Sequence, residues 1–284
     1  MDFIFILKAI VMGVVEGLTE FVPVSSTGHM ILIGSLIDFS GDFAKMFEVV
    51  VQLGAILAVV VLYWKKIKTS VVEFFKYIFS KGKEGKTGFK FGMNVIIGCI
   101  PMGIVGVIFY SKIKKLFAPY YVIIGFIVGG ILLIVIENIF RKNKKAVNDI
   151  DKVSYKQSLI VGCFQVLAVW PGMSRSASTI MGGWIAGLST SIAAEFSFFL
   201  AIPAMIGSSA KDLMEFDYST MNATYWVALI IGFIVAFLVS LFVMEAFVAF
   251  LKKRPMRIFA VYRVLMGTIL AILVGCGVIV LTSV

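Results

Sequence analysis

The stretch EGLTEFVPVSSTGH, residues 16–29, decides how this chain folds, because it puts polar side chains into a region otherwise hydrophobic enough to enter a bilayer. It contains two carboxylates, a proline, three consecutive hydroxyl residues, a glycine and the only histidine of the chain. Glu16 and Glu20 are four residues apart, so on a helix they share one face. One acidic residue at the centre of a membrane helix costs roughly 2.5–3.5 kcal/mol, so the pair marks a functional site.

The composition outside this stretch is that of a membrane protein. The chain has 284 residues, of which 60% are hydrophobic and 15% charged, and its mean hydropathy is +1.03. Soluble domains are nearer half apolar and a quarter charged. Apolar runs of spanning length recur from end to end, so we expect a polytopic, all-α protein that forms a single integral membrane domain over residues 1–284.

The net charge of +10 does not indicate nucleic-acid binding. The lysines cluster between hydrophobic segments, as the cytoplasmic loops of membrane proteins require. We therefore expect the lipid bilayer, and no nucleic acid, as the partner of this surface.

The first polar stretch interrupts its helix. Pro23 ends the helix, and Ser25, Ser26 and Thr27 offer N-caps for a short helix over residues 28–37. Neither piece reaches the roughly 20 residues that a full span needs. Residues 3–37 are therefore predicted to form a re-entrant helix–loop–helix, which is tolerated in a membrane only where protein or a water-filled cavity surrounds the broken backbone.

A second stretch, FQVLAVWPGMSRSAST from Phe164, repeats this pattern of apolar helix, proline break and capping hydroxyls, and predicts a second re-entrant pair over residues 158–188. Residues 65–90 are expected to form an exposed, lysine-rich loop. The pattern predicts pseudo-repeats over approximately residues 1–140 and 157–284. About six full spans remain, over residues 43–64, 91–110, 121–140, 193–210, 225–250 and 258–281.

The basic loops predict the orientation of the two repeats. With residues 65–90, 141–156 and 252–257 placed in the cytoplasm, the first re-entrant pair enters from outside and the second from inside. That arrangement is an inverted repeat, with the two broken loops meeting at depth. The lysines of residues 112–115 fall on the external side and count against this orientation.

Each broken loop ends in a helix N-terminus, where free N–H groups and the helix dipole favour an anion. Arg175 adds a forked cation suited to phosphate. A phosphorylated ligand could bind here, with a divalent cation bridging it to Glu16 and Glu20. The expected ligand-binding residues are Ser25, Thr27, Gly28, Gly172, Ser174, Ser176, Thr179 and, on the span after the first pair, Gln52. Gln52 could instead form a polar contact between helices. Thr179 could instead hydrogen-bond the backbone of its own helix.

The same groups suggest catalysis. Ser26 could attack phosphorus, with Glu20 or His29 as its base and Arg175 stabilising the transition state. Attack by a water on a metal held by Glu16 and Glu20 is the competing version. Two other classes of protein fit the pattern as well: a polyprenyl-phosphate flippase, because inverted repeats with broken helices are typical of transporters, and an ion-coupled transporter that uses the two glutamates.

Three segments resemble the undecaprenyl-diphosphate phosphatase, or bacitracin-resistance, family: GVVEGLTEFVPVSSTGHM at residues 13–30, FEVVVQLGAILAVV at 47–60 and GCFQVLAVWPGMSRSAST at 162–179. The similarity runs through essentially the whole chain. The paired glutamates of that family match Glu16 and Glu20, and its serine–threonine–glycine–histidine segment matches residues 26–29. Its proline–glycine–serine–arginine motif matches Pro171, Gly172, Ser174 and Arg175.

The resemblance implies an enzyme of the bacterial plasma membrane that hydrolyses undecaprenyl diphosphate to undecaprenyl phosphate and inorganic phosphate. That reaction recycles the lipid carrier of cell-wall synthesis and confers resistance to bacitracin, which binds the diphosphate. The resemblance also implies dependence on a divalent cation, Mg²⁺ or Ca²⁺, an inverted-repeat architecture, a possible homodimer and an active site that opens toward the outer face.

Overall fold

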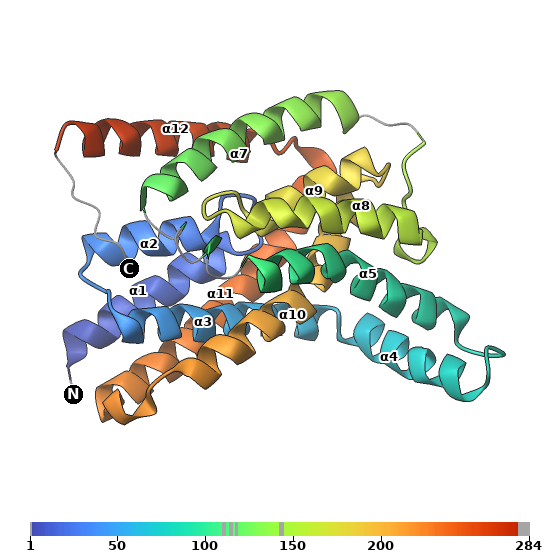
Figure 1. Ribbon diagram of the computed structural model, residues 1–284, viewed down its shortest axis with the longest axis horizontal. Coiled ribbons are helices and arrows are strands. Elements are labelled where there is room, and N and C mark those ends of the chain that lie inside the picture. The colour runs from blue at the N-terminus through green and yellow to red at the C-terminus, as the bar shows by residue number, and fades with distance from the viewer. Residues whose placement is uncertain (1, 110–111, 114–115, 117–118, 142–144, 278–284) are drawn as a thin grey trace.

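The computed structural model describes residues 2–277 except 110–111, 114–115, 117–118 and 142–144. Its described part is mainly helical, with short 3₁₀ turns at Ile150–Lys152, Val166–Val169 and Tyr218–Thr220 and an isolated β-bridge between Val147 and Leu188. The helices are α1 Phe3–Thr19, α2 Ser26–Leu36, α3 Asp42–Leu62, α4 Trp64–Phe79, α5 Lys86–Ile108, α7 Pro119–Phe140, α8 Tyr155–Gln165, α9 Arg175–Ile185, α10 Thr190–Glu215, α11 Ala223–Lys253 and α12 Arg257–Gly275 (Figure 1).

Six of the described helices are long and apolar enough to cross a membrane: α3, α5, α7, α10, α11 and α12. They correspond to the six predicted spans and confirm a multi-pass membrane protein. The predicted span ends Tyr110 and Leu281, and the loop lysines Lys114 and Lys115, lie outside the described residues.

The two helix pairs α1–α2 and α8–α9 do not cross the molecule (Figure 1). Each enters from one end, turns near the middle and returns, and the two pairs enter from opposite ends. The second helix of each pair, α2 or α9, has 11 residues, too few for a span. The predicted re-entrant pairs and their inverted arrangement are therefore present, although α2 begins at Ser26 rather than at residue 28.

The caps of α2 and α9 are formed in the same way. Ser25 and Ser174 precede these helices, and both have left-handed backbones, with φ of 73° and 69°. In each, the serine hydroxyl accepts a hydrogen bond from a backbone N–H of the first turn. A left-handed serine is uncommon, and its strain is offset here by the capping bond. The matched caps place Arg175 of the second repeat at the position that Ser26 holds in the first.

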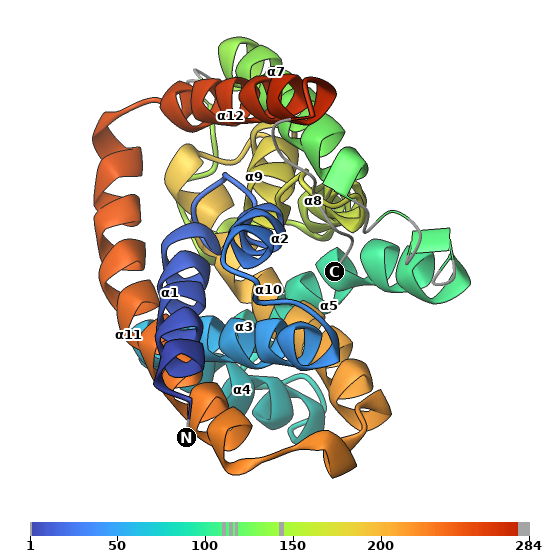
Figure 2. The ribbon, with the colours of Figure 1, turned by 90° about the vertical axis from the view of Figure 1, so that its left-hand side faces the viewer.

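Glycines bring α1 and α3 into backbone contact with the long helix α11. A Cβ atom at Gly13 of α1 would lie 2.8 Å from the carbonyl oxygen of Gly232, and one at Gly54 of α3 would lie 2.6 Å from that of Phe233. Such small-residue contacts are the usual means by which membrane helices approach closely. In Figure 2, α11 runs along one flank of α1, while α7 and α12 lie beyond α2.

The prediction of an exposed loop over residues 65–90 is wrong. Most of that segment is helical, in α4 and the first turns of α5, and only a short turn at residues 80–85 separates them. The lysines of α4 alternate with apolar residues at helical spacing, and its Phe74 ring stacks on Phe89 of α5 at 5.1 Å. The many lysines of this segment favoured a loop in the sequence-based prediction, although their spacing is that of an amphipathic helix.

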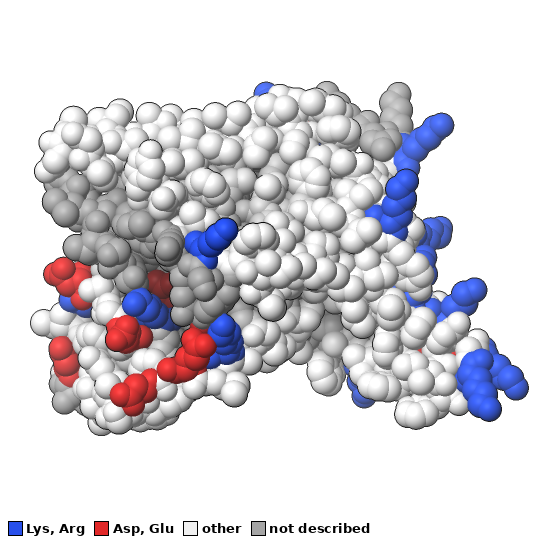
Figure 3. Space-filling model, in the orientation of Figure 1, with Lys and Arg blue, Asp and Glu red and all other residues white. Residues whose placement is uncertain are grey.

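Basic and acidic side chains gather at opposite ends of the molecule. Figure 3 shows most of the lysines and arginines at the end where α4 turns into α5, and most of the acidic side chains at the other end. Exposed acidic residues at that other end include Asp38, Asp42, Asp212, Glu215 and Asp217. The α1–α2 pair enters from the acidic end, and the α8–α9 pair enters from the basic end.

Candidate active site

Glu20 joins the two broken loops. Its Oε1 lies 2.6 Å from a terminal nitrogen of Arg175, and its Oε2 accepts a hydrogen bond from the Ser26 hydroxyl at 2.5 Å. The side chains of Glu20 and Arg175 are only 5% and 11% exposed, so this ion pair is shielded from water. The nucleophile, base and cation predicted from the sequence therefore form one continuous set of contacts between the first repeat and the second.

Arg175 is fixed on its other side by α10. Its second terminal nitrogen donates to the carbonyl oxygen of Ser197 at 2.9 Å. The Thr179 hydroxyl lies 2.7 Å from the Ser197 hydroxyl and 2.9 Å from the Arg175 carbonyl oxygen. Thr179, predicted to bind ligand, is fully buried in this network and helps to hold Arg175 in place.

Glu16 is fully buried one turn before Glu20. No described residue donates a hydrogen bond to either of its carboxylate oxygens. It interacts electrostatically with Glu20 and Glu48, which repel it, and with Arg175, which attracts it. Two buried oxygens without donors, facing further carboxylates, suit a bound cation, because an uncompensated buried charge is very costly. The described side chains contain no group of three or more His, Cys, Asp or Glu placed to hold a metal, so protein ligands alone would leave coordination positions open.

The remaining hydroxyls of the loops hold the loops together. Ser176 donates to the carbonyl oxygen of Val22 at 3.2 Å, which links the second loop directly to the first. The Ser174 hydroxyl lies 3.1 Å from that of Ser176 while it also caps α9. Ser25 caps α2 through the Gly28 N–H at 3.4 Å. Ser25, Ser174 and Ser176 are all buried at the junction, where the sequence placed them.

The other predicted ligand-binding residues occupy different settings. Thr27 is half-buried in the first turn of α2. Gly28 faces the ring of Phe126, which a Cβ there would meet at 2.7 Å. Gly172 has φ of 90°, and a Cβ on it would lie 2.3 Å from the carbonyl oxygen of Val122, so only glycine fits. Gln52 is half-buried on α3 and makes no hydrogen bond to either loop among the described residues.

His29 lies beside the loops with both ring nitrogens in contact with other groups. Nδ1 is 2.8 Å from the carbonyl oxygen of Ser25, and Nε2 is 2.7 Å from the hydroxyl of Tyr262 on α12. Of the two bases considered for Ser26, the one in contact with its hydroxyl is therefore Glu20.

Sequence reasoning missed Arg263. This fully buried side chain on α12 donates to carbonyl oxygens of both loops, Gly172 and Met173 at 2.9 Å and Pro23 at 3.5 Å, and to Gly125 of α7 at 3.1 Å. Its signal was present in the sequence: an arginine within an otherwise apolar span marks a functional position, as the paired glutamates do. Ser197 and Tyr262 gave no comparable signal.

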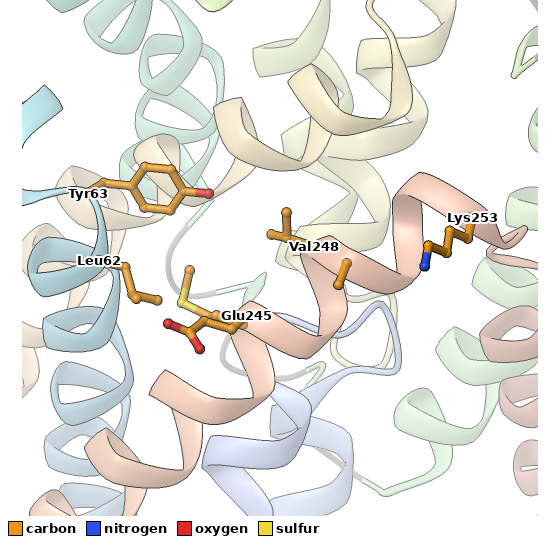
Figure 4. A pocket seen from close by; sticks show the side chains of 7 residues that line it. Leu62, Tyr63, Glu245, Val248 and Lys253 are labelled. Carbon is orange, nitrogen blue, oxygen red and sulfur yellow. The ribbon is translucent and has the colours of Figure 1, made fainter.

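A pocket of about 390 Å³ lies apart from these residues, where α3 and α11 end. In Figure 4 the Glu245 carboxylate turns toward Leu62, and Lys253 lies farther along α11. The pocket contains none of the predicted site residues and is lined by Leu62, Tyr63, Met244, Glu245, Val248, Ala249 and Lys253.

Comparison with known proteins identifies the family that this chain resembles. Residues 9–269 match the family model described as bacitracin resistance protein BacA. The chain is 69% identical over 279 residues to undecaprenyl-diphosphatase 2 of Clostridioides difficile, with 98% of each chain covered. It is 64% identical over 300 residues to undecaprenyl-diphosphatase of Clostridium perfringens, with 98% of this chain and 99% of the relative covered. It is 55% identical over 269 residues to that of Clostridium tetani, with 94% and 96% covered.

Proposed function

The chain belongs to the bacitracin resistance protein BacA family, and from this membership and the geometry of the two loops we propose that it hydrolyses undecaprenyl diphosphate to undecaprenyl phosphate and inorganic phosphate. The reaction recycles the lipid carrier of cell-wall synthesis and confers bacitracin resistance. The observation that supports the site is the chain of contacts from Arg175 through Glu20 to Ser26, at 2.6 and 2.5 Å.

These contacts suit transfer of a phosphoryl group. When the Ser26 oxygen attacks the terminal phosphorus, its proton passes to Glu20, a new O–P bond forms, and the bond to the departing lipid phosphate breaks. Protonation removes the negative charge that holds Arg175, so the guanidinium becomes free to pair with the oxygens of the transferred phosphoryl group. Water then attacks the phosphorus of the phosphoserine, the bond from phosphorus to the Ser26 oxygen breaks, inorganic phosphate leaves, and the proton held by Glu20 returns to the Ser26 oxygen. If water attacks phosphorus directly, Glu20 takes its proton instead and Ser26 serves as a hydrogen-bond donor.

Glu16 and Glu20 would hold a divalent cation, Mg²⁺ or Ca²⁺, which neutralises charge on the diphosphate when it is bound. The buried oxygens of Glu16, which no described residue satisfies, support this assignment. In this proposal the remainder of the diphosphate site is formed or supported by Ser25, Thr27, Gly28, Gly172, Ser174, Ser176, Thr179 and Gln52.

The protein would lie in the bacterial plasma membrane with the α1–α2 pair entering from the outer face. The lysine-rich turn between α4 and α5 supports this orientation, because basic loops stay in the cytoplasm. The lipid tail would stay in the bilayer while the head reaches the buried loops. A homodimer is also part of the proposal and is tested by cross-linking in native membranes.

The test is phosphate release from undecaprenyl diphosphate by the purified protein in detergent, with Ser26→Ala and, as a matched control, Ser178→Ala. Among the described residues, the Ser178 hydroxyl bonds only the Ser174 carbonyl oxygen at the start of its own helix, at 2.8 Å, so its loss should leave turnover within about twofold. Release without a second membrane compartment supports a phosphatase. Translocation in vesicles without phosphate release would instead support the flippase.

A further inference from the structure

Helix α12 reaches the junction of the loops through two consecutive residues, Tyr262 and Arg263. The Arg263 guanidinium contacts backbone oxygens of both loops, as described above, and the Tyr262 hydroxyl contacts the imidazole of His29 at 2.7 Å. This helix follows both repeats' loops in the sequence, and nothing in the reaction described above uses its tyrosine.

The contacts of His29 determine which ring nitrogen carries the proton. The Ser25 carbonyl oxygen, 2.8 Å from Nδ1, can only accept, so Nδ1 must donate to it. In the neutral imidazole, Nε2 then has the free electron pair, and the Tyr262 hydroxyl, which can donate, is the group that it accepts from. The basic nitrogen of the histidine is therefore held by the tyrosine.

The ring is also fixed in orientation. The planes of His29 and Tyr262 are nearly parallel, at 9° with centroids 5.7 Å apart, and Phe126 meets the imidazole edge-on at 5.4 Å. His29 is 6% exposed, whereas Tyr262 is 38% exposed. The tyrosine thus stands between the buried imidazole and the surroundings of the protein. The Ser26 proton already has a different acceptor in Glu20.

We propose that Tyr262 is a positioning residue for His29: its hydroxyl fixes the imidazole as the Nδ1–H form, with the basic Nε2 aimed at a single donor. A ring held in this way keeps Nε2 unprotonated and oriented, which is the form in which His29 could serve as the alternative base to Glu20. The kinetic consequence rests on the proposed phosphatase reaction, whereas the contact itself does not.

The contact can be measured without any activity, because the chain has one histidine and an imidazole ¹⁵N spectrum of selectively labelled protein reports that residue alone. In the unaltered protein we expect a protonated Nδ1 and an unprotonated, hydrogen-bonded Nε2. Tyr262→Phe should move the Nε2 signal toward that of a free ring nitrogen and leave Nδ1 protonated. The control Tyr225→Phe, on α11 where the ring stacks on Phe43 at 4.1 Å, should change neither signal. A protonated Nε2 in the unaltered protein, or an unchanged spectrum in Tyr262→Phe, overturns the proposal.

A double-mutant cycle tests the role in turnover. Tyr262→Phe should lower kcat roughly tenfold, the scale of one hydrogen bond, and change KM less than twofold. In a His29→Asn background the same substitution should have no further effect, because the tyrosine acts through the histidine. An equal tenfold loss in both backgrounds would show that Tyr262 acts independently of His29 and would overturn its role in positioning. If the unaltered protein releases no phosphate, the proposed function fails, while the ¹⁵N result still decides whether the contact exists.

Discussion

Replacement of Arg175 by methionine gives the sharpest test of the link between the two repeats. The substitution keeps much of the side-chain volume but removes the guanidinium that lies 2.6 Å from Glu20. Glu20 would be left as a buried carboxylate whose remaining partner is the Ser26 hydroxyl. Removing one member of a buried ion pair costs about 3–5 kcal/mol, most of it because the other charge is left uncompensated. We therefore expect Arg175→Met to be destabilised by that amount and to lose at least ~100-fold in turnover, the scale of losing one transition-state donor.

The double variant Glu20→Gln/Arg175→Met separates the two effects. It removes the Glu20 charge together with its cation, so that Glu16 is the carboxylate left without the attraction of Arg175, and it should regain part of the lost stability while it stays inactive. Denaturant titration in one detergent and phosphate release would be measured for four proteins: Arg175→Met, the double variant, Glu20→Gln and the unaltered protein. The reasoning is refuted if Arg175→Met is as stable as the unaltered protein, or if the double variant is no more stable than the single one.

The other predictions concern the remaining parts of the site. Ser26→Ala should fold normally and lower phosphate release at least ~100-fold; near-normal turnover would mean that water attacks phosphorus directly. Glu16→Gln with Glu20→Gln should weaken the Mg²⁺ or Ca²⁺ response, and a metal titration identical to that of the unaltered protein would rule out their metal role. Ser174→Ala keeps the left-handed backbone strain and loses the cap, at about 1 kcal/mol, whereas Ser174→Gly relieves the strain, so thermal melts should rank the alanine variant as less stable than the glycine variant.

The re-entrant pairs were predictable because their signals are local. A proline break, capping hydroxyls and helices too short to span all lie within a few residues of Pro23 or Pro171. The positive φ values of Ser25 and Ser174 were not predictable, since serine seldom adopts this conformation and only the surrounding loop imposes it. The contact of Arg175 with Glu20 was predictable only if the two loops meet. The inverted repeat was the reason to expect that they do.

Contacts made by later helices could not be predicted from the pattern. Periodicity indicates that α12 has an apolar face, but it does not indicate which loops that face will meet, so Tyr262 and Arg263 were left out. Ser197 was missed for a similar reason: it lies opposite Glu48 only in the register that the matched caps of α2 and α9 define, and those caps are visible only in the structure. For α4, the charge of the lysines was weighed above their helical spacing.

The glycine contacts of α11 restrict where a long isoprenoid chain can pass. Carbonyl oxygens of α11 touch α1 at Gly13 and α3 at Gly54, and peptide groups cannot rotate aside as side chains do. Close backbone packing of these three helices leaves little room for a hydrocarbon chain along that flank. On the α2 side, the neighbour of Gly28 is a side chain, the buried ring of Phe126, rather than a carbonyl oxygen. A lateral gate for the lipid is therefore to be sought between α2 and α7.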